Sequence, residues 1–141
     1  MIEPGSIAPT GAPPTLRWLS PLALRPTEES IPDRIREVIA LIVAQQAWTQ
    51  PVCVERDSLA LLDGHHRRAA ALQLGFARIP VYLYDYAEVD IRSWRADMAP
   101  TKAEVVLRAE TGRLYPHKTT RHIFTGNAAI DVGLRDLLPR C

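Results

Sequence analysis

Ionisable side chains are concentrated in one short segment of the sequence, Leu61 to Phe76, which reads LLDGHHRRAAALQLGF. An acid, a glycine, two histidines and two arginines lie there between an apolar segment and an alanine-rich one. A turn that only joined a strand to a helix would need the glycine and a capping acid, but not the histidines and arginines. The excess predicts that this turn binds a ligand, and the arginines favour an anionic one.

A helix that begins near Gly64 or His65 would supply an anion site from its main chain. The first N–H groups of a helix have no partner within it, and the helix dipole adds positive charge at the same end. Arg67 and Arg68 would place two cations in this first turn, where cations are otherwise unfavourable. Asp63 would then contact magnesium or a substrate hydroxyl. The alternative is that Asp63 is only the N-cap, with the histidines and arginines as a solvated helix face.

A second group of cations and hydroxyls lies near the end of the chain, in LYPHKTTRHIF. This segment has neither helical nor alternating periodicity, which predicts a loop, and its composition suits a small anion. The alternative, a solvated basic loop, accounts for the charges but not for the pair of hydroxyls. The residues concerned are Lys118, Thr119, Thr120, Arg121 and His122.

The elements around these two groups predict an α+β fold, with a small mixed sheet flanked by helices in one compact domain. Apolar residues at helical spacing predict a helix over 32–46, and a Thr-x-x-Glu capping box predicts another over 102–111. A third helix would follow the turn at Gly64 and end at Gly75. We expect strands over 51–55, 58–62, 78–86 and 89–94, the first two forming a hairpin, and an edge strand or an extended entry segment over 16–24.

Composition and charge narrow the class of protein. The 141 residues suffice for one hydrophobic core, and 17 Lys and Arg against 16 Asp and Glu argue against a dedicated nucleic-acid binder. Residues 1–15 are rich in proline and nearly uncharged, so we expect a flexible tail followed by one domain over 16–141. The sequence contains neither a membrane span nor a signal peptide pattern, which predicts a soluble, cytoplasmic protein.

The segment DGHHRRAAALQLGFARIPV resembles the nucleotide-binding box of the ParB/sulfiredoxin superfamily. Sulfiredoxins need a cysteine where this chain has His65, and ParB itself has Gly-Glu-Arg-Arg in the box and a helix-turn-helix domain after it. The free L-serine kinases match best, because four of their features recur in order. These are the acidic pair Glu28-Glu29, the DGHHR box at Asp63 to Arg67, Trp94 after a strand, and KTTRH at 118–122.

This resemblance implies a nucleotide-dependent kinase that uses ADP or ATP with Mg²⁺ to convert free L-serine, or a similar small hydroxyl substrate, to O-phosphoserine. Glu28 or Glu29 would take the proton of the serine hydroxyl, and Asp63 would orient that hydroxyl or hold Mg²⁺. Gly64, His65, His66, Arg67 and Arg68 would bind the nucleotide, with either histidine donating a hydrogen bond to the transferred group. Trp94 would form a wall of the serine pocket, and Lys118, Thr119, Thr120, Arg121 and His122 would hold the carboxylate or the new phosphate.

A second hypothesis is a ParB-like nucleotide-binding or DNA-associated regulatory module that phosphorylates no small molecule. It rests on resemblance of the fold, which is weak support for a function. The balanced charge argues against DNA as a partner. The sequence leaves open the phosphate donor, the acceptor, the choice between Glu28 and Glu29 as base, and whether the chain forms a homodimer.

Overall fold

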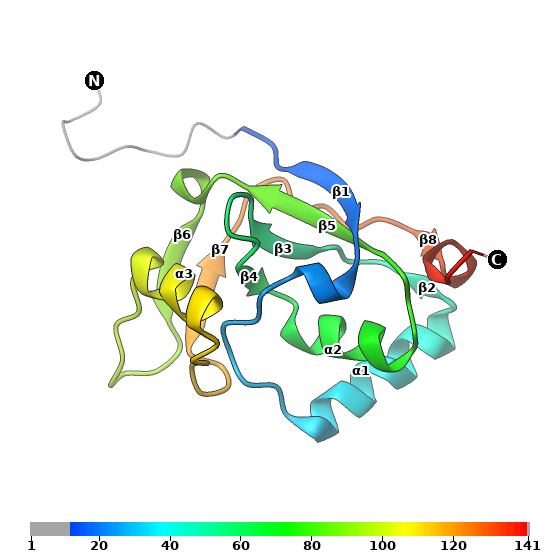
Figure 1. Ribbon diagram of the computed structural model, residues 1–141, viewed down its shortest axis with the longest axis horizontal. Coiled ribbons are helices and arrows are strands. Elements are labelled where there is room, and N and C mark those ends of the chain that lie inside the picture. Colours follow the sequence, from blue (N-terminus) through cyan, green and yellow to red (C-terminus); the bar gives the residue numbers. More distant parts are fainter. Residues whose placement is uncertain (1–11, 141) are drawn as a thin grey trace.

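A computed structural model describes residues 12–140 of the chain and has a four-stranded mixed sheet at its centre (Figure 1). The strand order is β1-β5-β3-β4. Strand β5 (Ile79–Tyr84) pairs antiparallel with β1 (Thr15–Leu19) and parallel with β3 (Val52–Glu55), and β3 pairs antiparallel with β4 (Leu61–Asp63). The buried strands β3 and β5 therefore lie in the middle, as their nearly continuous apolar sequences favour.

Two helices, α1 (Pro32–Gln45) and α2 (His65–Gln73), lie side by side below the sheet in Figure 1. Helix α1 buries Ile35, Val38 and Ile42, which fall on one face at helical spacing. Helix α2 is short and buries Ala70 and Ala71, whose small side chains allow it to pack closely. The sheet and these helices enclose the main core together with Leu24, Trp48, Val54, Leu61 and Ile79.

The remaining elements flank this body at its two ends in Figure 1. At one end, β6 (Asp90–Ser93) pairs antiparallel with β7 (Thr120–Ile123), near α3 (Lys102–Thr111). At the other end, β2 (Ala47–Trp48) pairs with β8 (Val132–Gly133). Short 3₁₀ helices span Pro21–Ala23, Tyr86–Glu88 and Leu134–Leu137.

The predicted α+β class is confirmed, and the three predicted helices are present with small differences at their ends. Of the edge strand or extended segment predicted over 16–24, the first part forms the edge strand β1. The strand ends at Leu19 because Ser20 accepts a hydrogen bond from the Leu22 N–H and begins a 3₁₀ helix. The loop predicted at 118–122 was wrong in part, since residues 120–123 form β7. Most of the expected tail, residues 1–11, lies outside the described residues, and the domain limits stay a prediction. None of the helices within residues 12–140 has the length and apolar character to cross a membrane.

Candidate functional site

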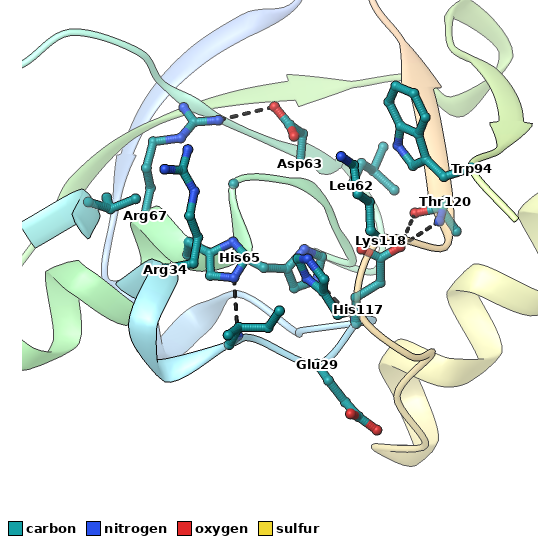
Figure 2. Close-up of a pocket in the computed structure, with 15 residues that line it drawn as sticks. Glu29, Arg34, Leu62, Asp63, His65, Arg67, Trp94, His117, Lys118 and Thr120 are labelled. Carbon is teal, nitrogen blue, oxygen red and sulfur yellow. Dashed lines mark hydrogen bonds and ion pairs between the residues drawn. The ribbon is translucent and has the colours of Figure 1, made fainter. Parts of the chain in front are cut away.

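A cavity of about 620 Å³ opens at the N-terminal end of α2 (Figure 2). Four parts of the chain that are far apart in the sequence contribute to its walls: the segment leading into α1, the turn between β4 and α2, the end of β6, and the segment before β7. The lining residues that the sequence had singled out are Glu28, Glu29, Asp63, Gly64, His65, His66, Arg67, Trp94, Lys118 and Thr120. The cavity therefore joins the two groups of ionisable residues.

Gly64 occupies a position that other residues would not fit. Its φ of 103° is left-handed, and a Cβ there would lie 2.6 Å from Cγ1 of Val52. Gly64 is also the N-cap of α2, and no side chain within residues 12–140 caps this end of the helix. Asp63 is therefore the last residue of β4 and not the N-cap. The main-chain N–H groups of the first turn are left available to an anion.

The two arginines of this turn have different surroundings. Arg67 lines the cavity and donates from Nη1 to the carbonyls of Gln50 and Pro51, at 2.7 and 2.9 Å. Its Nη2 lies 3.1 Å from a carboxylate oxygen of Asp63. Arg68 instead donates from Nε to the Pro21 carbonyl at 2.8 Å and does not line the cavity. Of the two arginines in this turn, Arg67 is therefore the one that adds its positive charge to the cavity wall.

His65 is buried and holds the segment before α1 against α2. Its Nε2 accepts hydrogen bonds from the N–H groups of Thr27 and Glu28, at 3.0 and 3.1 Å. Burial lowers the pKa of His65 to about 3, so the ring is neutral at physiological pH. Because Nε2 accepts these bonds, the proton of the neutral ring lies on Nδ1.

His66 repeats this arrangement one residue later. Its Nε2 accepts a hydrogen bond from the Ile31 N–H at 3.1 Å, and its ring lies edge-on to that of His117, with centroids 5.3 Å apart. Burial lowers the pKa of His66, and the nearby His117 lowers it further. Both histidines of the turn therefore fasten the segment that carries Glu28 and Glu29.

The two glutamates point in different directions. Oε1 of Glu28 accepts hydrogen bonds from the N–H groups of Thr119 and Thr120, at 3.1 and 2.5 Å, and from the Thr120 hydroxyl at 2.8 Å. In Figure 2 the carboxylate of Glu29 points away from the other labelled side chains. The Glu29 main chain pairs instead with Tyr115, whose carbonyl accepts its N–H at 2.9 Å. Glu28 is thus the glutamate whose carboxylate reaches the segment before β7.

Trp94 lies close to two cations at the edge of the cavity. Nζ of Lys118 lies 5.3 Å from the indole centroid and Cζ of Arg121 lies 4.8 Å from it, within range of cation–π attraction. Lys118 has a left-handed φ of 58°, unusual for a lysine. Hydrogen bonds of the next two residues, Thr119 and Thr120, to Glu28 hold this conformation. The indole remains 52% exposed and so is available to a ligand.

Comparisons of sequence find relatives of two kinds, although no protein-family model matches the chain. A ParB-like protein of Sulfolobus acidocaldarius is 38% identical over 87 residues, which cover 60% of this chain and 43% of that protein. An ATP-dependent L-serine kinase of Staphylothermus marinus is 31% identical over 77 residues, covering 50% of this chain and 31% of the kinase. The chain thus spans less than half the length of these curated relatives.

Comparison of structures gives a match over nearly the whole chain. Free serine kinase in complex with AMP has a TM-score of 0.79 at 17% identity, covering 96% of this chain and 98% of that one. The chain has the fold of free serine kinase. A C-terminally truncated SbnI of Staphylococcus aureus has a TM-score of 0.77 at 14% identity, covering 86% of this chain and 88% of that one. The resemblance to ParB-like proteins and free serine kinases is therefore confirmed.

Within this free serine kinase fold, four of the residues singled out in the sequence do not line the cavity: Arg68, Thr119, Arg121 and His122. Thr119 is buried and donates its hydroxyl to the Pro116 carbonyl at 2.7 Å. Nε2 of His122 lies 2.7 Å from the Tyr86 hydroxyl, and burial lowers the pKa of His122 to about 4. The roles predicted for these four residues stay predictions.

The free serine kinase fold also brings residues to the cavity that the sequence analysis missed. Arg34, in the first turn of α1, adds a second arginine to the wall, and His117 precedes the KTTRH segment. Arg34 could have been found by the argument applied to Arg67, because it too is a cation in the first turn of a helix, where cations are unfavourable. The apolar lining residues Ile31, Val38 and Leu62 had no such signal.

Proposed function

We propose that this chain is a phosphotransferase that moves a phosphoryl group from a nucleotide to the hydroxyl of free L-serine. The observation that carries the proposal is the single cavity in which the Glu28 carboxylate, Asp63 and the uncapped start of α2 meet. Phosphoryl transfer requires mainly a donor and an acceptor held in position, neutralisation of charge, and a base for the hydroxyl. Names of the relatives support the same chemistry, since they include ATP-dependent L-serine kinase.

The nucleotide phosphates would bind at the start of α2. The N–H groups that follow Gly64 and the guanidinium groups of Arg67 and Arg34 would offset their charge. Structures of free serine kinase with AMP, and of a glutamate mutant of that kinase with ADP, support a nucleotide site in this fold.

Asp63 is suited to help hold Mg²⁺ together with these phosphates. Mg²⁺ is commonly bound by one or two carboxylates and the phosphates of the substrate, not by a site made of protein alone. Residues 12–140 contain no cluster of three or more metal-binding side chains, which agrees with such a shared site. One oxygen of Asp63 is paired with Arg67, so the other is the candidate ligand. The ion would neutralise charge on the phosphates when bound.

Glu28 would act as the base. Three hydrogen bonds to Oε1 fix its carboxylate, and Oε2 would accept the proton of the serine hydroxyl. The serine oxygen would form a bond to the terminal phosphorus of ATP or ADP as the bond to the leaving ADP or AMP breaks. Lys118 would pair with the serine carboxylate beside Trp94. His65 and His66 would position Glu28 through the main chain and transfer no proton.

The decisive experiment is phosphorus NMR of the protein with Mg²⁺, L-serine and either ADP or ATP. We expect a phosphoserine signal from the unaltered chain and from Glu29→Gln. Glu28→Gln should slow its formation by about 10²-fold or more, the usual effect of removing a general base. Glutamine can still accept at Oε1, so this variant keeps the three hydrogen bonds that hold the segment before β7.

Two results would contradict the proposal. The first is equal loss of activity in the Glu28 and Glu29 variants, which would remove the distinction between the two carboxylates. The second is absence of phosphoserine with both donors while nucleotide binding is intact. That outcome would favour a nucleotide-binding module, the reading that the ParB-like relative supports.

A further inference from the structure

Arg95 follows Trp94 after the end of β6, and its side chain reaches the segment before β7. Its Nη2 donates to the His117 carbonyl at 2.7 Å, across 22 positions of the sequence. Arg95 does not line the cavity. Within residues 12–140 no ion pair joins its guanidinium to a carboxylate, and its Nε is buried without a hydrogen-bond partner. This half-buried arginine is therefore used for a main-chain carbonyl and not for a charge.

The end of β6 holds the segment before β7 at two points. The Trp94 N–H donates to the Thr119 carbonyl at 2.9 Å, and Arg95 donates to the His117 carbonyl. The Ser93 hydroxyl fixes the main chain of Arg95, because it accepts from the Arg95 N–H at 3.0 Å and donates to the Arg95 carbonyl at 2.7 Å. The guanidinium of Arg95 is thus directed at the residue that precedes position 118.

The main-chain conformation of Lys118 is set by the two peptide groups that flank it. Rotation of the first group, between positions 117 and 118, changes φ, and rotation of the second, between 118 and 119, changes ψ. The carbonyl of the first group accepts from Arg95, and the N–H of the second donates to Oε1 of Glu28. Arg95 and Glu28 together therefore hold the left-handed φ of 58° at Lys118, which is unfavourable for residues that have a Cβ.

We propose that Arg95 is a positioning residue for Lys118, and through it for the carboxylate of the amino acid in the cavity. Nζ of Lys118 lies 5.3 Å from the Trp94 centroid at the cavity edge (Figure 2), a place that depends on the φ and ψ of the lysine. Without Arg95 the peptide group before Lys118 is free to turn, and the residue would relax to a negative φ. The ammonium group would then leave its place beside Trp94. The inference rests on the proposed function only in that the cavity takes serine or phosphoserine.

The test combines calorimetric titration of the full chain with O-phospho-L-serine and with ADP, and kinase assays at varied L-serine. Arg95→Met should weaken O-phosphoserine binding and raise KM for serine about ten-fold, because an unsupported residue adopts the left-handed conformation only in a small fraction of molecules. The affinity for ADP and kcat should change less than about three-fold, since only the grip on the carboxylate is lost. Arg95→Lys should recover part of the loss, because its ammonium group can still donate to a carbonyl.

A second substitution separates positioning from a general loss of structure. If Arg95 acts through Lys118, then Arg95→Met should weaken O-phosphoserine binding less than about two-fold in a chain that already carries Lys118→Met. Arg92→Met is the matched control, because Arg92 also lies on β6 but is 59% exposed and pairs with Asp90. It should bind both ligands as the unaltered chain does. Equal effects of Arg95→Met with and without Lys118, or equal losses of ADP and O-phosphoserine binding, would overturn the inference.

Failure of this inference can be distinguished from failure of the proposed function. Phosphoserine formation, combined with effects of Arg95→Met that do not depend on Lys118, would overturn the role of Arg95 and leave the kinase in place. Binding of O-phosphoserine that depends on Arg95 through Lys118, without formation of phosphoserine from serine, would remove the function and support the role of Arg95. Absence of O-phosphoserine and L-serine binding in the unaltered chain would overturn both.

Discussion

Acid should weaken this protein through His65. The ring is buried and neutral, and protonation would add a charge to the interior and remove the acceptor for the Thr27 and Glu28 N–H groups. In the unfolded chain the same ring gains its proton near pH 6.5. Since the pKa of His65 is about 3 in the folded state, the unfolded chain binds one more proton between these limits. Stability present above pH 6.5 is therefore lost as the pH falls toward 3.

The size of the loss follows from the two pKa values. Each pH unit between them costs about 1.4 kcal/mol for one proton, so lowering the pH from 7.5 to 5.0 should cost about 2 kcal/mol through His65 alone. The pKa of His122, about 4, acts in the same direction. Carboxylates that are stabilised in the folded state would add their own losses at lower pH.

Urea unfolding at pH 7.5 and 5.0, followed by tryptophan fluorescence, measures this directly. His65→Gln should lose about 2 kcal/mol less than the unaltered chain between the two pH values, because Oε1 of glutamine can accept both N–H groups and does not titrate. His122→Gln should keep the His65 part of the loss and so serves as the control. Equal losses in the unaltered chain and in His65→Gln, or an NMR titration of His65 near pH 6.5, would refute the reasoning.

Two further predictions concern the turn after β4. Gly64→Ala should destabilise the chain by about 2–4 kcal/mol in urea unfolding, from the left-handed φ and the 2.6 Å approach to Val52. Gly75 has a φ of 74°, and a Cβ there would have no atom within 4 Å, so Gly75→Ala should lower the free energy of unfolding by only about 1–2 kcal/mol. Equal losses in the two variants would contradict the role of the Val52 contact. Arg67→Ala should weaken ADP binding about ten-fold in calorimetry, while Arg68→Ala should change it less than three-fold. An equal effect of both arginines would show that the cavity wall does not distinguish them.

The helices could be predicted because their signals are local. Ile35, Val38 and Ile42 recur at helical spacing, and Thr101 caps α3 by accepting the Glu104 N–H, as the capping box predicts. Strand β7 could not be predicted in this way. It forms by pairing with β6, a partner distant in the sequence, and its own sequence, TRHI, lacks the alternation of apolar and polar residues that predicts a strand.

The candidate site shows the same difference between local features, which could be predicted, and features that depend on distant residues, which could not. Residue types and the glycine marked the turn at Gly64 as a ligand site, and the cavity does lie there. The direction of each side chain depends on residues far along the chain. Arg68 points away from the cavity because its Nε donates to the Pro21 carbonyl, and His65 accepts a hydrogen bond from the Thr27 N–H. Neither Pro21 nor Thr27 is marked as a partner by any local signal in the sequence.

The two histidines after Gly64 connect the turn at the start of α2 to the segment that carries Glu28, on the other side of the cavity. The main chain of this turn faces the place proposed for phosphates, while its two imidazoles hold the segment that carries Glu28. We therefore expect a shift of the first turn of α2 on one side to move the Glu28 carboxylate on the other. For the proposed kinase, this connection predicts that binding of the donor and alignment of the acceptor are coupled, and that substitutions in this turn change both together.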